Sequence, residues 1–326
     1  MIKVEWFYWL CGLLFLFGAV LTLRDRSNSK RYGSAAFWGL LGASFGYSTF
    51  VVNKTAPPWV LGLVVIAMTV LVGTGQLGRG TEVSTSLAEK AAAAQRFGNK
   101  LFVPPLVIPL GALIFAVGLA KIKAGDQPLL EKGSETLIGL GVSAVAAAIV
   151  GVIMLRPPSV LTPLKEGHRL LEVIGWAAVL PQMLATLGRL FTDAGVGSAV
   201  GKVTTHVLPE GSLFGSVVVY CLGMALFTVI MGNAFAAFPI MTAAIGYPVL
   251  VQTFDGNPAT VFAIGMLAGF CGTLTTPMAA NFNLVPAALL DMKSRYGPIK
   301  AQLPTAIPLL VCNIFLMYFL AFGVLS

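Results

Sequence analysis

The sequence predicts an all-α polytopic membrane protein of about 8–10 transmembrane helices, with a re-entrant hairpin and broken helices in its C-terminal half. Hydrophobic residues make up 57% of the chain and charged residues 10%, against about 45–50% and about 25% in a soluble domain. Apolar runs recur that are long enough for a hydrocarbon core of about 30 Å. Two long uncharged runs, 211–254 and 256–290, are each interrupted near the middle. These observations exclude a soluble globular protein.

The first half of the chain contains simple spanning segments. Small residues between Gly42 and Gly46 suit close helix packing. The capping-box pattern Ser86-Leu87-Ala88-Glu89 predicts a short helix in the third loop, which we interpret as a solvated linker. Hydropathy and length predict five crossings, at 6–23, 34–52, 58–73, 102–120 and 136–155.

The basic residues follow an alternating pattern along these segments. They gather in the first, third and fifth loops, whereas the second loop has only Lys54 and the fourth balances lysines with acidic residues. Positive loops stay in the cytoplasm, so we expect both termini outside. The formal net charge of +8 therefore reflects membrane topology, and no nucleic-acid partner is expected.

The second half is less regular. The uncharged run between Glu172 and Arg189 is short for a crossing and contains Pro181-Gln182, which favours a re-entrant hairpin over 171–207 with its tip at this pair. The number of crossings between 171 and 290 stays open. We expect a spanning-helix scaffold at 1–160 and a transport part at 161–326, whose further segments are 212–231, 238–253, 258–271, 276–290 and 303–325.

The first candidate site is the interruption at Gly232, Asn233 and Ala234. Where a helix unwinds, the free N–H groups and the dipole of the next half-helix favour an anion. The Asn233 amide adds donors and an acceptor, and Ala234 leaves room for close approach. The alternative is a loop or a packing notch on the membrane surface.

The second candidate site is the polar cluster in the next uncharged run, together with the hairpin tip. We expect Pro277 to open a new helix, and hydroxyls and amides around it to bind a polar solute or to hold Na⁺ with backbone carbonyls. The alternative is that the threonines bond back to their own helix carbonyls. The candidate residues are Thr273, Thr275, Thr276, Asn281 and Asn283, with Gln182 at the tip.

Charged candidates are few. Arg189 and Asp193 have the spacing of a helical ion pair, and Arg189 is either a carboxylate ligand or a side chain that reaches the interface. Glu172, His168 and His206 are expected at the interface, where either histidine could carry protons. We expect no metal and no enzyme, because the sequence has no HExxH, GxSxG or P-loop motif and its four cysteines lie in apolar stretches.

Several motifs resemble one family over nearly the whole chain. They are Trp6–Trp9, Gly232–Pro239 (GNAFAAFP), Gly272–Pro277 (GTLTTP) and Asn281–Asn283. The chain resembles bacterial membrane proteins of domain-of-unknown-function family 979. This resemblance implies a permease subunit of the bacterial inner membrane, encoded beside a smaller membrane protein of family 969 and near 5-oxoproline metabolism genes. The GNAFAAFP segment is also distantly similar to unwound motifs of the ion transporter superfamily, which includes dicarboxylate and citrate carriers.

These observations predict a secondary active transporter subunit for a small carboxylate, with 5-oxoproline as the suggested solute. Such carriers pair two inverted halves, each with a hairpin and a broken helix, but this chain shows one such set clearly. A second membrane subunit of the family 969 type would supply the other half. We expect no cofactor beyond a coupling ion, Na⁺ or H⁺. The alternative is a non-transporting assembly or regulatory subunit in the membrane.

Overall fold

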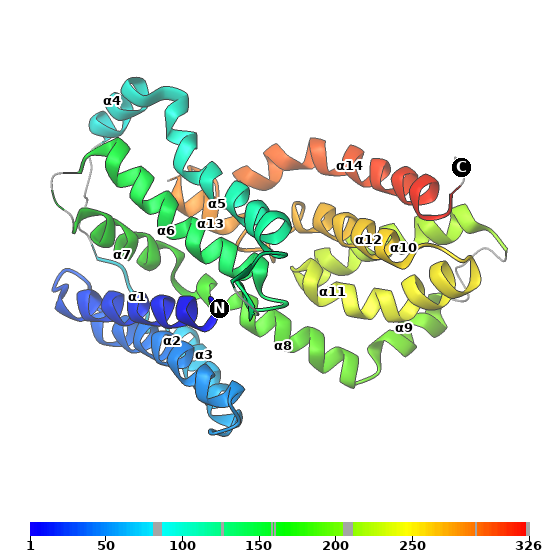
Figure 1. The fold of residues 1–326 in the computed structure, drawn as a ribbon, viewed down its shortest axis with the longest axis horizontal. Helices are drawn as coiled ribbons and strands as arrows, with labels where there is room; N and C mark the ends of the chain where they lie inside the picture. Colours follow the sequence, from blue (N-terminus) through cyan, green and yellow to red (C-terminus); the bar gives the residue numbers. More distant parts are fainter. Residues whose placement is uncertain are drawn as a thin grey trace. The chain divides into compact units, whose positions relative to one another are not determined.

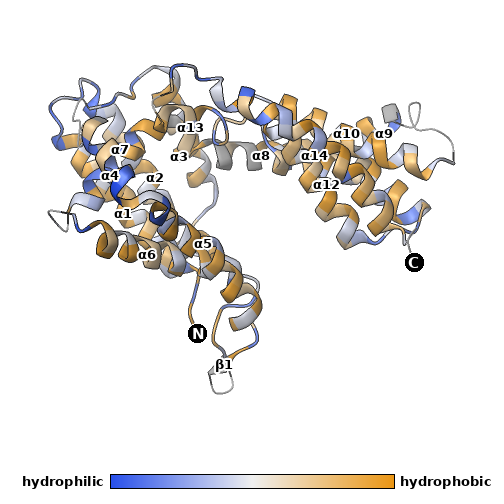
Figure 2. Ribbon diagram, turned by 90° about the horizontal axis from the view of Figure 1, so that it is seen from above, coloured by the Kyte–Doolittle hydropathy of each residue, from blue (hydrophilic) through white to orange (hydrophobic). Residues whose placement is uncertain are grey.

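The computed structural model describes residues 1–80, 87–124, 127–157, 159, 161–204, 211–290 and 292–323. In these residues, seven helical segments are long and apolar enough to span a bilayer, and two shorter apolar helices accompany them. Figure 2 shows hydrophobic residues along the helices and hydrophilic ones in α4 and the connections. The prediction of an all-α polytopic membrane protein is confirmed. The seven are Glu5–Arg24, Arg31–Val52, Ala91–Leu119, Glu135–Leu155, Leu213–Met231, Ala234–Thr253 and Gly297–Ala321.

The chain divides into two compact units, Met1–Glu172 and Val173–Ser326. The first unit holds α1 (Glu5–Arg24), α2 (Arg31–Val52), α3 (Trp59–Gly73), α4 (Leu87–Phe97), the 3₁₀ helix η1 (Gly98–Phe102), α5 (Val103–Leu113), the π-helix η2 (Ile114–Leu119), the short strands β1 (Lys123–Ala124) and β2 (Gln127–Pro128), α6 (Glu135–Leu155) and most of α7 (Thr162–Ile174) (Figure 1). Helices are present at all five expected crossings; four are long enough to span a bilayer, and α3 is one of the two shorter apolar helices. The expected linker helix is α4, and Ser86 of its capping box lies outside the described residues.

Small residues allow the helices of this unit to pack closely. A Cβ atom added to Gly42 would lie 2.8 Å from the Gly12 carbonyl oxygen, so α1 and α2 are nearly in backbone contact. Gly111 on α5 faces the Ser143 hydroxyl of α6 in the same way. Close approach at glycine is how membrane helices gain packing energy when lipid supplies no hydrophobic driving force. The predicted close packing at Gly42 is confirmed.

The loops of the first unit separate into two groups. The connection 25–30, the segment 74–80 and α7 share hydrogen bonds at the end of α1 that Arg24 occupies. At the opposite end, the Ile2 N–H donates to the Leu129 carbonyl at 2.8 Å, and the Val4 N–H donates to Glu131 Oε2 at 2.9 Å. The odd-numbered loops thus meet at one end, and the amino terminus meets the fourth loop at the other.

The second unit contains η3 (Gly175–Ala178), α8 (Leu180–Asp193), α9 (Val196–Thr204), α10 (Leu213–Met231), α11 (Ala234–Met241), the π-helix η4 (Thr242–Thr253), α12 (Pro258–Thr273), α13 (Leu284–Leu289) and α14 (Gly297–Ala321). Its core lies among α10, η4, α12 and α14, where Tyr220, Met224, Ile245 and Met317 are fully buried. The prediction of a helix at 276–290 is wrong. Residues 274–283 are non-helical, and α13 has only six residues.

α8 and α9 are consecutive helices joined by a turn at Ala194 and Gly195. Gly195 has φ +72° and ends α8 in the left-handed region, which glycine adopts without strain. The expected tip at Pro181-Gln182 is wrong, because Pro181 lies in the first turn of α8, where its missing N–H costs nothing. With 14 and 9 residues, the two helices are about 21 and 14 Å long, shorter than a bilayer crossing. A re-entrant hairpin over 171–207 stays a prediction.

Candidate functional site

The first predicted interruption separates α10 from α11. Gly232 ends α10 with φ +77°, and its N–H still donates to the Thr228 carbonyl at 2.7 Å. Asn233 is extended and caps α11, since its Oδ1 accepts the Phe235 N–H at 2.7 Å. This cap occupies the side-chain oxygen of Asn233 and leaves its side-chain NH₂ group without a partner in the described residues.

The second interruption is the non-helical segment 274–283 after α12. Two of its threonines bond back along the chain: Thr273 Oγ1 donates to the Gly269 carbonyl at 3.3 Å, and Thr275 Oγ1 to the Gly272 carbonyl at 2.8 Å. The alternative considered from the sequence therefore holds for both hydroxyls. The expected helix start at Pro277 is wrong, because the chain turns through 277–283 and becomes helical only at Leu284.

The two interruptions lie against each other. Thr276 is buried, and its Oγ1 donates to the Val229 carbonyl of α10 at 2.9 Å. That carbonyl lies in the last turn of α10, where no helical N–H is left to reach it. A Cβ atom added to Gly232 would lie 2.7 Å from the Met278 carbonyl oxygen. The segment 274–283 thus supplies a hydrogen-bond donor to the end of α10, and the backbones of the two interruptions are in close contact at Gly232 and Met278.

Asn283 holds the second interruption in shape. Its side chain has no exposed surface, and its Nδ2 donates to the Thr273 carbonyl at 3.0 Å and to the Thr276 carbonyl at 2.6 Å. Both neighbours are acceptors, so the orientation of the amide is fixed. Its Oδ1 is buried and has no hydrogen-bond partner in the described residues.

A groove of about 340 Å³ lies between α8 and the first turns of α11. This volume is within the range of about 300–1,000 Å³ that small-molecule sites occupy. α8 and α11 approach each other closely at this groove, where Gly188 of α8 faces Ala236 of α11. Its lining residues are Gly188, Arg189, Thr192, Asp193, Phe235 and Pro239.

Arg189 and Asp193 are the charged groups of this groove. Both are exposed, and the ion pair expected between them is not formed within 4 Å. In the described residues Arg189 makes no hydrogen bond or ion pair. Exposed pairs of long side chains gain little from association. The guanidinium is therefore available to an anion in the groove.

Aromatic rings connect the groove to the two interruptions. Phe235 of α11 meets Phe270 of α12 edge-on, with ring centroids 5.7 Å apart, and Phe270 contacts Phe282 of the non-helical segment at 6.2 Å. A ligand that displaces Phe235 would therefore act on a ring packed against the second interruption.

A known protein family matches the chain over nearly its whole length. The family model described as "Protein of unknown function (DUF979)" covers residues 5–322. The chain belongs to this family. No curated protein and no solved structure matches it. The resemblance of the sequence motifs to family 979 is confirmed, and the distant similarity to the ion transporter superfamily stays a prediction.

In this DUF979 protein, six of the predicted site residues form two adjoining groups, and the other three lie apart from them. Gly232, Asn233 and Ala234 form the break before α11, and Thr273, Thr276 and Asn283 form the adjoining backbone network. Thr275 lines a separate apolar groove among α10, α12 and α14. Asn281 is exposed, and Gln182 lies in the first turn of α8, away from the turn between α8 and α9.

The sequence indicated Arg189 only as an alternative, and it did not single out Thr192 or Phe235. The available signal was the spacing of Arg189, Thr192 and Asp193, which places all three on one face of a helix. What that face opposes depends on how α8 packs on α11, and no periodicity in the sequence reports this.

Proposed function

We propose that this chain is a subunit of a secondary active transporter for a small carboxylate, bound in the groove between α8 and α11. The observation that carries the proposal is the position of Arg189, which lines this groove beside the first turn of a helix that begins within an apolar crossing. Broken helices at membrane depth are tolerated where they line a cavity, and their N-terminal ends favour anions.

The groove chemistry suits a carboxylate that also carries an N–H group. A guanidinium binds a carboxylate through two parallel hydrogen bonds. Asp193 and Thr192 offer acceptors for an N–H donor on the same ligand. 5-Oxoproline, with a carboxylate and a ring amide, has this combination. Its small ring also suits a groove bounded by Phe235 and Pro239.

Two interruptions that meet in the core of one unit favour transport over a purely structural role. A regulatory or assembly subunit has no need for helices broken inside uncharged segments, because such breaks require compensation by side chains such as Thr276 and Asn283. The sequence contains no P-loop, so we propose that an ion gradient, of Na⁺ or H⁺, drives the carrier. We also propose a second membrane subunit, of the family 969 type.

Uptake into proteoliposomes tests the proposal. Labelled small carboxylates, including 5-oxoproline, are offered with Na⁺ or H⁺ gradients, to this protein alone and together with the neighbouring membrane subunit. Arg189→Gln is expected to weaken apparent affinity by about 10- to 150-fold, the cost of about 1.5–3 kcal/mol for one charge-assisted contact. Arg295→Gln, an exposed residue outside the groove, serves as the control and is expected to change little.

Two results would contradict this proposal. Unchanged affinity in Arg189→Gln would remove the groove as the solute site. Absence of gradient-driven uptake in every arm, with protein correctly inserted, would favour the assembly or regulatory subunit.

We also propose residence in a bacterial inner membrane with both termini outside. The grouping of the odd-numbered loops at one end of the first unit supports a common side for them. Cysteines placed at Lys54 and Ser326 are expected to react with a membrane-impermeant maleimide in intact cells, whereas those at Arg26 and Lys90 are not. Ser326 lies outside the described residues. Reaction at position 26 or 90 in intact cells would reverse the orientation.

A further inference from the structure

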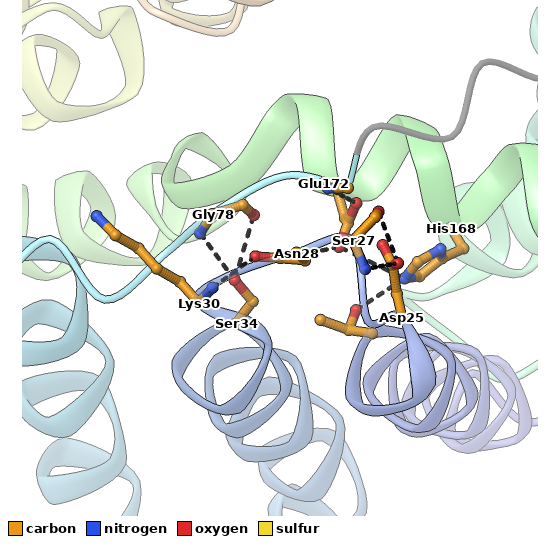
Figure 3. A network of polar contacts seen from close by, with 10 residues as sticks. Asp25, Ser27, Asn28, Lys30, Ser34, Gly78, His168 and Glu172 are labelled. Atoms are coloured by element: carbon orange, nitrogen blue, oxygen red, sulfur yellow. Dashed lines mark hydrogen bonds and ion pairs between the residues drawn. The ribbon is translucent and has the colours of Figure 1, made fainter.

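A buried carboxylate lies at the end of the first unit where the odd-numbered loops meet. The Glu172 side chain on α7 is 6% exposed. Its Oε1 accepts the Asn28 Nδ2–H at 3.2 Å, and its Oε2 accepts the Gly80 N–H at 2.9 Å (Figure 3). One side chain thus joins three segments that are far apart in the sequence.

His168 is the titratable neighbour of this carboxylate. It lies one turn earlier on α7 and is 13% exposed, and its Nε2 is 3.8 Å from Glu172 Oε1. The same nitrogen is 2.7 Å from the hydroxyl of Thr22, which is fully buried. A protonated imidazole at this position supplies the charge that a buried carboxylate otherwise lacks.

The other charged groups nearby have different partners or are exposed. In the described residues, no lysine or arginine forms an ion pair with Glu172. Asp25 faces Gly80 from the other side and accepts the Ser27 N–H at 2.8 Å. On α7, Arg169 pairs with Glu166 at 3.0 Å. The remaining charged residues of these segments are Arg24, Arg26, Lys30, Arg31, Arg79 and Lys165, and all except Arg31 are exposed.

The segment 74–80 is docked against α2 and α7 mainly by polar contacts. Gly78 exchanges two hydrogen bonds with Ser34, at 2.9 and 3.2 Å, and Lys30 Nζ donates to the Gly75 carbonyl at 2.6 Å. The Gly80 N–H on Glu172 is the contact nearest the end of the segment. Few apolar side chains hold this segment in place. The free energy lost with one hydrogen bond to a charged group is therefore a large part of the free energy that docks the segment.

We propose that Glu172 and His168 form a proton-binding site, and that uptake of a proton by Glu172 releases the segment 74–80 from α7. The carboxylate takes a proton from water and becomes a neutral acid. The Gly80 N–H and the Asn28 amide that contact it are both donors, so the new O–H gains no acceptor there and the Gly80 contact weakens. This inference does not rest on the proposed transport function.

Hydrogen exchange of the peptide that contains the Gly78 and Gly80 amides tests the proposal. The full-length protein in nanodiscs is labelled from about pH 6 to about pH 3.5, the range over which a glutamate carboxyl takes up its proton while an imidazole is already charged. Rates are corrected for the intrinsic pH dependence of exchange. Protection of this peptide is expected to fall by up to about 7-fold as the pH decreases, the limit that proton uptake by one ordinary carboxyl sets on a linked opening step. This experiment needs no variant, so a folding defect does not confuse it.

Two variants at neutral pH complete the test. Glu172→Gln has the shape of the protonated acid, and its NH₂ group competes with that of Asn28, so protection is expected to be low at every pH. Glu166→Gln, on the same helix but in a surface pair, is expected to match the native protein. Protection that is independent of pH in the native protein, or equal in Glu172→Gln and Glu166→Gln, would overturn the proposal.

Discussion

Asn283→Ala is expected to lower the free energy of unfolding by about 3–5 kcal/mol. The amide of Asn283 donates to two buried backbone carbonyls, those of Thr273 and Thr276. The Thr273 carbonyl would be left without a donor, at a cost of about 1–3 kcal/mol, and the Thr276 carbonyl would keep only the 3.3 Å bond from the Ala279 N–H. The lost side chain adds a small cavity. Unfolding by sodium dodecyl sulfate in mixed micelles, followed by circular dichroism, measures the change.

Asn281→Ala is the matched control, because this asparagine lies two residues away and is exposed. It is expected to change stability by less than about 0.5 kcal/mol. Equal effects of the two substitutions would show that the hydrogen bonds of Asn283 do not hold the segment 274–283 in place.

Gly232→Ala is expected to destabilise the second unit by about 2–4 kcal/mol. Two costs add: an alanine at φ +77° is strained, and its Cβ would lie 2.7 Å from the Met278 carbonyl oxygen. Because backbone atoms stand on both sides, relief requires α10 and the segment 274–283 to separate. Transport through the proposed groove is expected to fall with stability, since α11 begins immediately after this residue.

Gly195→Ala isolates the steric cost. Gly195 has φ +72°, close to that of Gly232, but a Cβ there meets no atom within 4 Å. The strained backbone alone is expected to cost about 1 kcal/mol. If both substitutions cost the same in thermal unfolding, the contact between Gly232 and Met278 contributes nothing, and the two interruptions are independent.

Hydropathy was sufficient to locate the long spanning helices in the sequence, because the bilayer, and not tertiary contacts, sets the length of a crossing. It failed at 276–290, which is as apolar as a crossing but contains Pro277 and the amide of Asn283. That amide bonds to the carbonyls of Thr273 and Thr276, so the local chain has a stable alternative to a helix. Composition does not report such a network.

The candidate site shows the same limit. Gly232 and Asn233 mark the first break because a left-handed glycine followed by a capping residue is a local signal. The partner of Thr276 is Val229, which lies 47 residues earlier in the chain. Pro181 was misjudged because a proline opens a helix as readily as it interrupts one. Local rules identify breaks, and only the packing of helices shows which breaks meet.

The cluster around Glu172 has a consequence for the order of assembly during synthesis. Glu172 is the last residue of the first unit, and its bond to Asn28 spans 144 residues. Chains are made from the amino terminus, so α1 to α6 enter the membrane before their polar end is closed. Until α7 emerges, Asn28, Thr22 and the Gly80 N–H have to bond to water. The first unit therefore remains open at this end until its final helix arrives.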